Sequence, residues 1–189
     1  MEQTQSKYKK LLESCTDRKD EVIKFTDFLE KNTVWLTSPA STRFHLNVKH
    51  GLLIHSVGVT ETLLKLREVL APQISKESCV IVGLFHDLGK IGTFEKPNYL
   101  KNNNEWEITK RNMKYKTNPD LVYMGIAQRS IFLVSQYLKL TDEEAQAILY
   151  HDGQYIEANK EVAHRECLLT LLLQFADTFH TAANEDGRK

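Results

Sequence analysis

A histidine and an aspartate stand side by side at the end of an apolar stretch, and together they could bind a metal ion. The stretch from Val80 to Phe85 is apolar on every side, so we expect a helix that is buried all round. We expect Gly89 to end this helix just after His86 and Asp87, where the helix dipole favours a cation. Burying an imidazole beside a carboxylate is costly unless something pairs with them. A metal ion would do so, and a structural histidine beside a salt-bridged aspartate is the alternative.

Two further residues of the same chemistry lie at inward-facing positions of expected helices. His55 falls on the apolar row of a helix expected at 51–70, so its side chain should point into the core. Asp177 follows Leu173 by one turn in a densely apolar helix expected at 160–183. An acid in such a run is expensive to ionise unless a cation is close. Each residue alone also has an ordinary explanation, a satisfied core histidine or an aspartate paired with a neighbouring hydroxyl or basic group.

The composition describes one soluble globular domain with a helical bias. The chain has 189 residues, with 25 basic and 25 acidic side chains and only 8 glycines and 4 prolines. This balance gives no overall attraction to nucleic acid or to an anionic membrane, although a local basic patch is compatible with it.

Cys15, Cys79 and Cys167 form no paired motif, so we interpret them as reduced thiols. No signal-peptide pattern or membrane-spanning run is seen, and we expect a cytoplasmic protein without membrane contact.

The hydrophobic periodicity predicts an all-α fold with a small β-hairpin insertion. Apolar residues at three- and four-residue spacings favour helices at 8–35, 51–70, 127–138 and 160–183. A short helix should begin at Thr141, because Thr141 and Glu144 have the spacing of a capping box. The expected parts are an N-terminal helical extension packed on the domain, the domain, its insertion and a flexible tail, at 1–34, 35–183, about 95–118 and 184–189.

The insertion is poor in aliphatic residues and rich in amide, aromatic and basic ones. The segment 102–104 looks like a turn between 98–101 and 106–110, which suggests that these two segments pair as strands. The basic residues of the insertion are Lys101, Lys110, Arg111, Lys114 and Lys116. A solvated hairpin explains this pattern, and so does a lid whose cations meet phosphate.

The order His, His-Asp, Asp along the chain resembles the HD-domain superfamily of metal-dependent phosphohydrolases. Blocks similar to those of small stand-alone bacterial and phage HD hydrolases begin at Pro39, Gly51, Leu84 and Leu140, and the Tyr99, Trp106 and Tyr115 segment resembles their insertion. The resemblance covers about residues 35–182. It implies an HD-domain helical bundle in which four side chains surround one divalent ion, namely His55, His86, Asp87 and Asp177.

Two imidazoles and two carboxylates form a mixed nitrogen and oxygen site. Such a site suits Mn, Fe, Co, Ni or Zn and is less specific for Mg, so we expect one divalent metal ion as cofactor. The ion would lower the pKa of a bound water molecule and neutralise charge on a phosphoryl group. The resemblance implies that Asp87 binds the ion and also orients the water molecule.

Further residues are candidates for catalysis or substrate binding. Lys90, one turn beyond the His-Asp pair, could reach a phosphate, or it is a surface lysine at a helix end. Arg43 and His45 precede the first ligand helix and could bind phosphate or sugar, or they are ordinary polar loop residues. His151 could contact substrate, transfer a proton or be a remnant ligand, and it could also merely end a helix. We assign Arg129 to substrate binding with these residues.

One block departs from the family pattern. Relatives that bind two metals carry a block like Gly-His-Gly-Glu-Lys-Ser, whereas this chain reads Gly-Ile-Ala-Gln-Arg-Ser, with Ile126 at the histidine position. An isoleucine cannot bind a metal, so we favour a mononuclear site. The remaining histidines, His50, His164 and His180, receive no role.

The leading hypothesis is a metal-dependent phosphohydrolase that acts on a nucleotide or a related small phosphate ester by attack of water. A catalytically degenerate HD module that binds a nucleotide or a protein partner is the alternative, motivated by Ile126. A nucleic-acid phosphodiesterase is a third hypothesis, motivated by the basic insertion but not favoured. A guanosine tetraphosphate hydrolase ranks low, because that branch carries an acidic pair where Leu88 to Lys90 stand here. Apolar helix faces leave a homodimer open.

Overall fold

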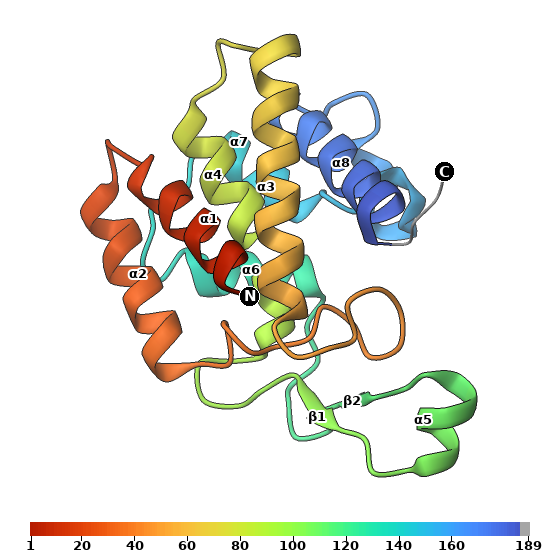
Figure 1. Cartoon of the computed structure of the whole chain (residues 1–189). Helices are drawn as coiled ribbons and strands as arrows, with labels where there is room; N and C mark the ends of the chain where they lie inside the picture. Colours follow the sequence, from red (N-terminus) through yellow and green to blue (C-terminus); the bar gives the residue numbers. More distant parts are fainter. Residues whose placement is uncertain (186–189) are drawn as a thin grey trace.

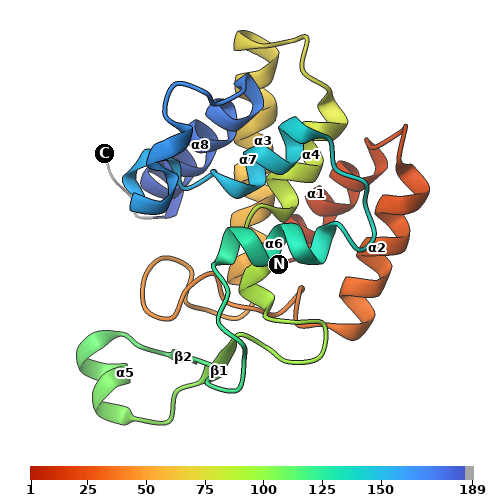
Figure 2. The same ribbon diagram turned by 180° about the vertical axis from the view of Figure 1, so that it is seen from behind.

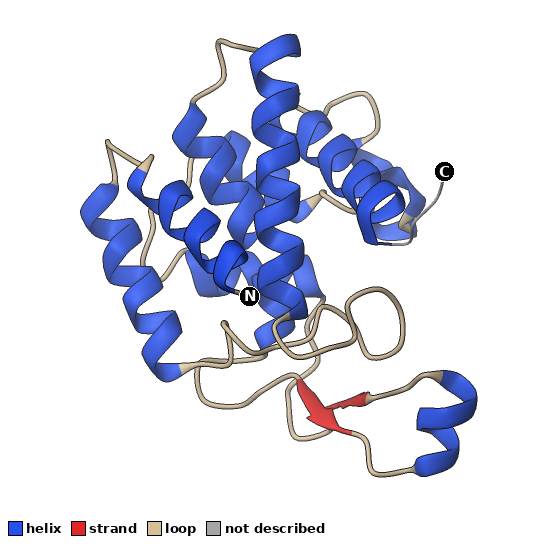
Figure 3. Ribbon diagram, in the orientation of Figure 1, coloured by secondary structure: helices blue, strands red, loops and turns tan. Residues whose placement is uncertain are grey.

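The computed structural model describes residues 1–185 and consists mainly of helices (Figure 1, Figure 3). The elements are α1 (Glu2–Glu13), α2 (Lys19–Asn32), α3 (Gly51–Leu70), α4 (Lys76–Phe85), the 3₁₀ helix η1 (Leu88–Ile91), β1 (Tyr99–Lys101), α5 (Glu105–Arg111), β2 (Tyr115–Thr117), α6 (Ile126–Val134), α7 (Asp142–Leu149), the 3₁₀ helices η2 (Gly153–Tyr155) and η3 (Glu157–Val162), α8 (Leu168–His180) and the π-helix η4 (Thr181–Glu185). The predicted helical fold with one small antiparallel sheet is confirmed. Of the expected tail at 184–189, the first two residues complete η4, and 186–189 lie outside the described residues.

α3 is the central helix of the bundle. It packs against α4 on one side and α8 on the other (Figure 1). α7 contacts both α4 and α8, and α6 packs on η1 and α7 on the face seen in Figure 2. Within residues 1–185, no helix is long and apolar enough to cross a membrane.

α4 is buried all round, as its apolar sequence predicts. It begins after Ser75, whose side chain accepts a hydrogen bond from the backbone N–H of Ser78. Every residue from 79 to 85 is buried against the helices on either side. The helix therefore ends inside the protein and delivers His86 and Asp87 to the interior.

The predicted role of Gly89 as the end of this helix is wrong. α4 ends at Phe85, and Gly89 lies within η1, where the chain passes close to α6. A Cβ atom at Gly89 would lie 2.3 Å from the carbonyl oxygen of Ile126, and its backbone N–H donates to Oγ of Ser130 at 2.8 Å. Glycine is needed here because two backbones approach closely.

The N-terminal helices share a hydrophobic core with the rest of the bundle. The ring of Phe25 on α2 lies 5.2 Å from the ring of Phe85 at the end of α4. Trp35 is fully buried, and its indole N–H donates to the hydroxyl of Tyr8 at 3.2 Å. A second apolar cluster fills the space between α3, α4, α7 and α8. The segment at 1–34 thus stabilises the helix that carries the His-Asp pair.

The strand pairing of the insertion differs from the prediction. β1 pairs with β2, with Tyr99 opposite Thr117, so the expected strand at 106–110 is wrong. That segment is helix α5, because Asn104 caps it by accepting a hydrogen bond from the backbone N–H of Glu107. The asparagines at 102–104 thus start a helix rather than form a hairpin turn.

Two helix boundaries also differ from those expected. α8 begins at Leu168 rather than at 160, because the backbone at His164 has a positive φ of 65°, which a helix cannot contain. α6 ends at Val134 rather than at 138. The capping box at the start of α7 is confirmed, since Thr141 and Glu144 exchange both hydrogen bonds.

Arg18 joins the start of α2 to two buried carboxylates. Its Nε atom lies 2.8 Å from Oε1 of Glu77, and its Nη atoms donate to Glu144. The side chain of Glu144 is fully buried and that of Glu77 is 6% exposed. Burial alone would raise the pKa of both glutamates, but the bonds to the Arg18 side chain, together with hydrogen bonds from backbone N–H groups, outweigh it and lower their pKa values.

We expect Arg18→Met to lower the free energy of unfolding by about 3–5 kcal/mol, because it leaves two buried carboxylates without their cation. Urea denaturation measures the change. Lys31→Met, which removes an exposed ion pair with Asp27, is the control and should cost about 0–1 kcal/mol. Equal losses for the two variants would contradict a structural role of the Arg18 network.

Candidate metal centre

The four side chains predicted to bind a metal ion meet at one point between α3, α4 and α8. Nε2 of His55 lies 3.2 Å from Nε2 of His86, 3.3 Å from Oδ2 of Asp87 and 3.3 Å from Oδ1 of Asp177. Nε2 of His86 lies 3.6 Å from the same Asp87 oxygen. Three of the residues are buried, and the side chain of Asp177 is 20% exposed. The structure therefore brings all four predicted residues together.

Hydrogen bonds at the other ring nitrogen orient the histidines. Nδ1 of His86 donates to the carbonyl oxygen of Gly83 at 2.9 Å, and Nδ1 of His151 donates to that of Ile148 at 2.8 Å. A carbonyl oxygen can only accept, so each Nδ1 atom carries a hydrogen. In the neutral rings the Nε2 atoms therefore keep their lone pairs, and these point into the cluster.

The donor atoms fit one divalent ion. Metal–ligand bonds of about 2.0–2.2 Å place two ligands of one ion about 2.8–3.6 Å apart at octahedral or tetrahedral angles. The four measured separations run from 3.2 to 3.6 Å. A set of two imidazoles and two carboxylates suits Mn, Fe, Co, Ni or Zn. His55, His86, Asp87 and Asp177 would hold such an ion.

A close approach of α3 and α8 positions two of these residues. A Cβ atom at Gly58 would lie 2.1 Å from the ring of His180, so the ring in its present position packs directly against the backbone of α3 at this glycine. His55 lies one turn before Gly58, and Asp177 lies one turn before His180. The contact between the two helices therefore sets the distance between His55 and Asp177.

Asp87 is the carboxylate to which the cluster converges. Its Oδ2 atom faces His55 and His86 and accepts a hydrogen bond from Nζ of Lys90, while Oδ1 lies 3.5 Å from Nε2 of His151. Burial alone would raise the pKa of Asp87. The charge of Lys90 and the neighbouring imidazoles outweigh burial and hold this pKa well below its usual range. Asp87 is therefore ionised at neutral pH in spite of its burial.

The three imidazoles differ in their pKa values. Burial alone would lower all of them, but hydrogen bonds with Asp87 and Glu185 raise the pKa of His55 to about 9. The bond with Asp87 likewise raises the pKa of His151 to about 9. Burial prevails at His86 and lowers its pKa to about 4. At neutral pH and without an ion, His55 and His151 therefore carry a second proton and His86 is neutral.

A cavity of about 340 Å³ opens onto the cluster. The residues that line it are His45, His55, Asp87, Lys90, Ile126, His151, Asp152, Asp177, Thr178, Thr181 and Ala182. The predicted catalytic or substrate-binding residues His45, Lys90 and His151 therefore lie beside the predicted metal ligands. Ile126, which takes the place of the histidine in the block that resembles relatives with two metals, forms part of the wall.

The structure does not bring the two arginines to this cavity. Arg43 is exposed, and its guanidinium lies 4.7 Å from the centre of the Phe44 ring. Its carbonyl oxygen accepts a hydrogen bond from the side chain of Asn112 in the insertion. Arg129 is buried on α6 and lines a neighbouring cavity, which meets the first at Ile126.

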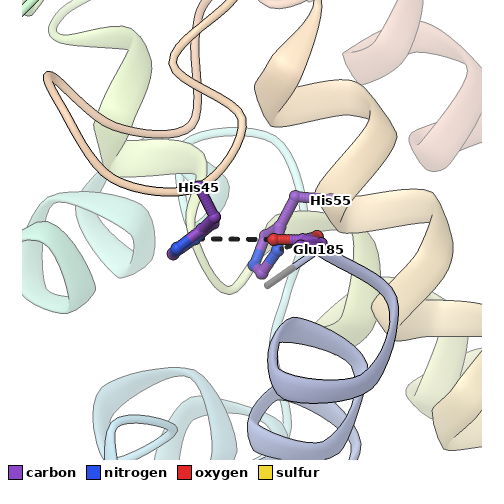
Figure 4. A group of neighbouring side chains, drawn as sticks. All are labelled: His45, His55 and Glu185. Atoms are coloured by element: carbon purple, nitrogen blue, oxygen red, sulfur yellow. Dashed lines mark hydrogen bonds and ion pairs between the residues drawn. The ribbon is translucent and has the colours of Figure 1, made fainter. Parts of the chain in front are cut away.

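Glu185 is the member of the site that sequence reasoning missed. Its Oε1 atom lies 2.9 Å from Nδ1 of His55, and its Oε2 atom lies 3.6 Å from Nε2 of His45 (Figure 4). Oε1 also lies 3.5 Å from Nε2 of His180. Burial alone would raise the pKa of Glu185, but the bond to His55 lowers it. The residue follows the last apolar helix and was expected in a tail, so no sequence pattern indicates its role.

The fold and the site define a helical domain with a buried His/Asp cluster that could hold a divalent metal. The HD domain family matches residues 52–182, which is more than half of the chain. The chain therefore belongs to the HD domain family, whose members are generally metal-dependent hydrolases. Neither the curated proteins nor the solved structures contain a match to the chain.

We expect Glu185→Ala to weaken divalent metal binding by about 10–100-fold, because the carboxylate fixes the His55 ring and increases the basicity of its Nε2 atom. Isothermal titration calorimetry with Mn²⁺ or Co²⁺ measures the affinity, and Glu185→Gln should fall between the two proteins. Glu157→Ala, at an exposed position, is the control. An affinity of Glu185→Ala equal to that of the wild type would contradict this role.

Metal binding should release a proton, because the ion must displace the one held on Nε2 of His55. The pKa of this residue is about 9 without an ion, so the apparent affinity should rise by about tenfold per pH unit between about pH 7 and pH 9 and then level off. Calorimetry in buffers of different ionisation enthalpy counts the protons. Binding without proton release near neutral pH would contradict the protonated state of His55.

Proposed function

We propose that the protein is a metal-dependent phosphohydrolase that acts on a nucleotide or a related small phosphate ester by attack of water. The observation that carries this proposal is that Nε2 of His55 lies 3.2–3.3 Å from donor atoms of His86, Asp87 and Asp177, beside a cavity that Lys90 and His151 also line. Membership of the HD domain family supports it.

A divalent ion bound by these residues would supply a water molecule of lowered pKa and would polarise a phosphoryl oxygen. Asp87 has one oxygen, Oδ2, directed at the predicted ligands and the other, Oδ1, directed at His151. Oδ1 can therefore orient the attacking water molecule and accept its hydrogen bond. Because the pKa of Asp87 is low, the carboxylate is in the form that accepts hydrogen bonds.

Lys90 and His151 act on the phosphate from the cavity wall. The ammonium of Lys90 is held at Asp87 and lies at the cavity, where it can neutralise charge on the phosphoryl oxygens as it develops. His151 carries a proton on Nε2 at neutral pH, since its pKa is raised to about 9. From this atom it can donate the proton to the leaving oxygen. His45 lines the same cavity, which supports its proposed contact with the substrate.

A binding module without catalysis is the second candidate, and Ile126 favours it. This side chain forms part of the cavity wall, where it can bind no second metal.

The hypothesis of a nucleic-acid phosphodiesterase gains less support, because two cationic side chains of the insertion already contact neighbouring side chains. Lys116 lies 3.0 Å from Glu107, and Arg111 lies 5.0 Å from the Trp106 ring.

The test is hydrolysis of a panel of nucleoside mono-, di- and triphosphates and cyclic nucleotides with each divalent metal, with the products separated and identified by chromatography. We expect metal-stimulated turnover, and we expect Asp87→Ala to reduce it by about a thousandfold or more, since it removes both a ligand and the group that orients water. Asp27→Ala, on the exposed face of α2, is the matched control and should keep full activity.

Absence of turnover from every compound would contradict the proposal. Nucleotide-dependent thermal stabilisation that persists in Asp87→Ala, together with no turnover, would instead support the binding module.

A further inference from the structure

Arg129 is a buried guanidinium that forms no ion pair with an acidic residue among the described residues 1–185. The residue is 5% exposed, and its side chain makes one hydrogen bond, from Nη2 to the carbonyl oxygen of Val122 at 2.7 Å. Within residues 1–185, no carboxylate forms an ion pair with it. Its other nitrogens thus have no protein acceptor in the described chain, and the side chain lines a cavity.

The contrast with Arg18 shows that this arrangement is unusual for the protein. Arg18 is more exposed than Arg129, yet it pairs with Glu77 and Glu144. A buried charge is costly unless it is paired, so an unpaired guanidinium in the interior calls for an anion that binds there. Burial lowers the pKa of Arg129, because the charged form of the guanidinium is less favourable away from water.

The first turn of α6 provides a second, independent indication at the same place. Gly125 precedes the helix and offers no side-chain cap. The backbone N–H groups of Ile126, Ala127 and Gln128 have no hydrogen-bond acceptor among the described residues. Uncapped N–H groups at the positive end of a helix dipole bind phosphate groups well. The guanidinium and these N–H groups therefore favour the same kind of ligand.

The cavity that Arg129 lines has a volume of about 490 Å³. Gly125, Ile126, Asn98, Tyr99 and Tyr123 are among the residues that line it. Ile126 also belongs to the wall of the metal cavity, so the two cavities are neighbours. This volume is sufficient for a phosphate group and part of a nucleoside.

We propose that the Arg129 cavity binds a second phosphate group of the substrate, next to the phosphate at the metal centre. The substrate is then a nucleotide that carries more than one phosphate group. The assignment of the first phosphate depends on the proposed function, whereas the anion site at Arg129 stands on its own geometry. A planar guanidinium binds two oxygens of one phosphate, which lysine cannot do in the same way.

The direct test is binding of inorganic tripolyphosphate to the full chain in the presence of EDTA, so that no metal contributes. Isothermal titration calorimetry should show binding to the wild type and at least tenfold weaker binding to Arg129→Met. Arg111→Met, which removes an exposed guanidinium from α5, is the matched control and should bind as the wild type does. Equal affinity of wild type and Arg129→Met would overturn the proposal, as would an equal loss in Arg111→Met.

Thermal unfolding separates this effect from a folding defect. Because Arg129 is a buried unpaired charge, Arg129→Met should unfold at the same temperature as the wild type or higher. If Arg129→Met does not fold, Arg129→Gln serves instead, since it keeps a donor for the Val122 carbonyl and removes the charge. Arg129→Gln should also bind tripolyphosphate at least tenfold more weakly than the wild type, and an affinity equal to that of the wild type would overturn the proposal.

Kinetics distinguish this proposal from the proposed function. Arg129→Met should raise KM for nucleoside triphosphates at least tenfold and leave KM for nucleoside monophosphates unchanged. If the protein turns over nucleotides and Arg129→Met has the same KM values as the wild type, the proposal of a phosphate site at Arg129 is contradicted. The proposed phosphohydrolase function is then still supported. If tripolyphosphate binding depends on Arg129 but no compound is turned over, the anion site is supported. The proposed phosphohydrolase function is then contradicted.

Discussion

The buried carboxylate of Asp87 is the constraint on which the arrangement of the site depends. It is 4% exposed, yet it is ionised, so cations and N–H donors must surround it. His55 comes from α3, Lys90 from η1 and His151 from the end of α7, and each lies within 3.5 Å of one of its oxygens. Elements that are distant in sequence therefore have to meet at the same point. A divalent ion would add the strongest compensating charge there, which links the stability of the fold to the chemistry of the site.

The helices that carry the predicted ligands could be anticipated from the sequence, because a helix is indicated by the spacing of residues that are close together in the chain. The helix at 51–70 and the inward direction of His55 follow from apolar residues at helical spacing, and the structure has both. The capping box at Thr141 sets the start of α7 in the same way. The inference that His55, His86, Asp87 and Asp177 meet required more than periodicity. It came from the order of these residues and their resemblance to a family, and the measured separations agree with it.

Other features could not be anticipated, because they depend on contacts between segments that are far apart in sequence. Gly89 has the position of a helix stop, but its actual constraint is the backbone of α6. Asn104 is compatible with a turn or with a helix cap, and only the pairing of β1 with β2 decides between them. Glu185 follows the last apolar helix, so its bond to His55 has no sequence signal. Arg129 is informative only once its burial is known, together with the absence of a paired carboxylate in the part of the chain that the structure describes, since the sequence contains many acids that could have paired with it.

The most direct measurement of the central claim is the position of a bound metal ion. Crystals of the protein grown with Mn²⁺ would locate it through an anomalous difference map. The account predicts one strong peak at about 2.0–2.3 Å from Nε2 of His55, Nε2 of His86 and one oxygen each of Asp87 and Asp177. A crystal grown at a saturating concentration of Mn²⁺ that shows no peak among these four atoms would contradict the account. So would an ion bound only between His45 and Glu185.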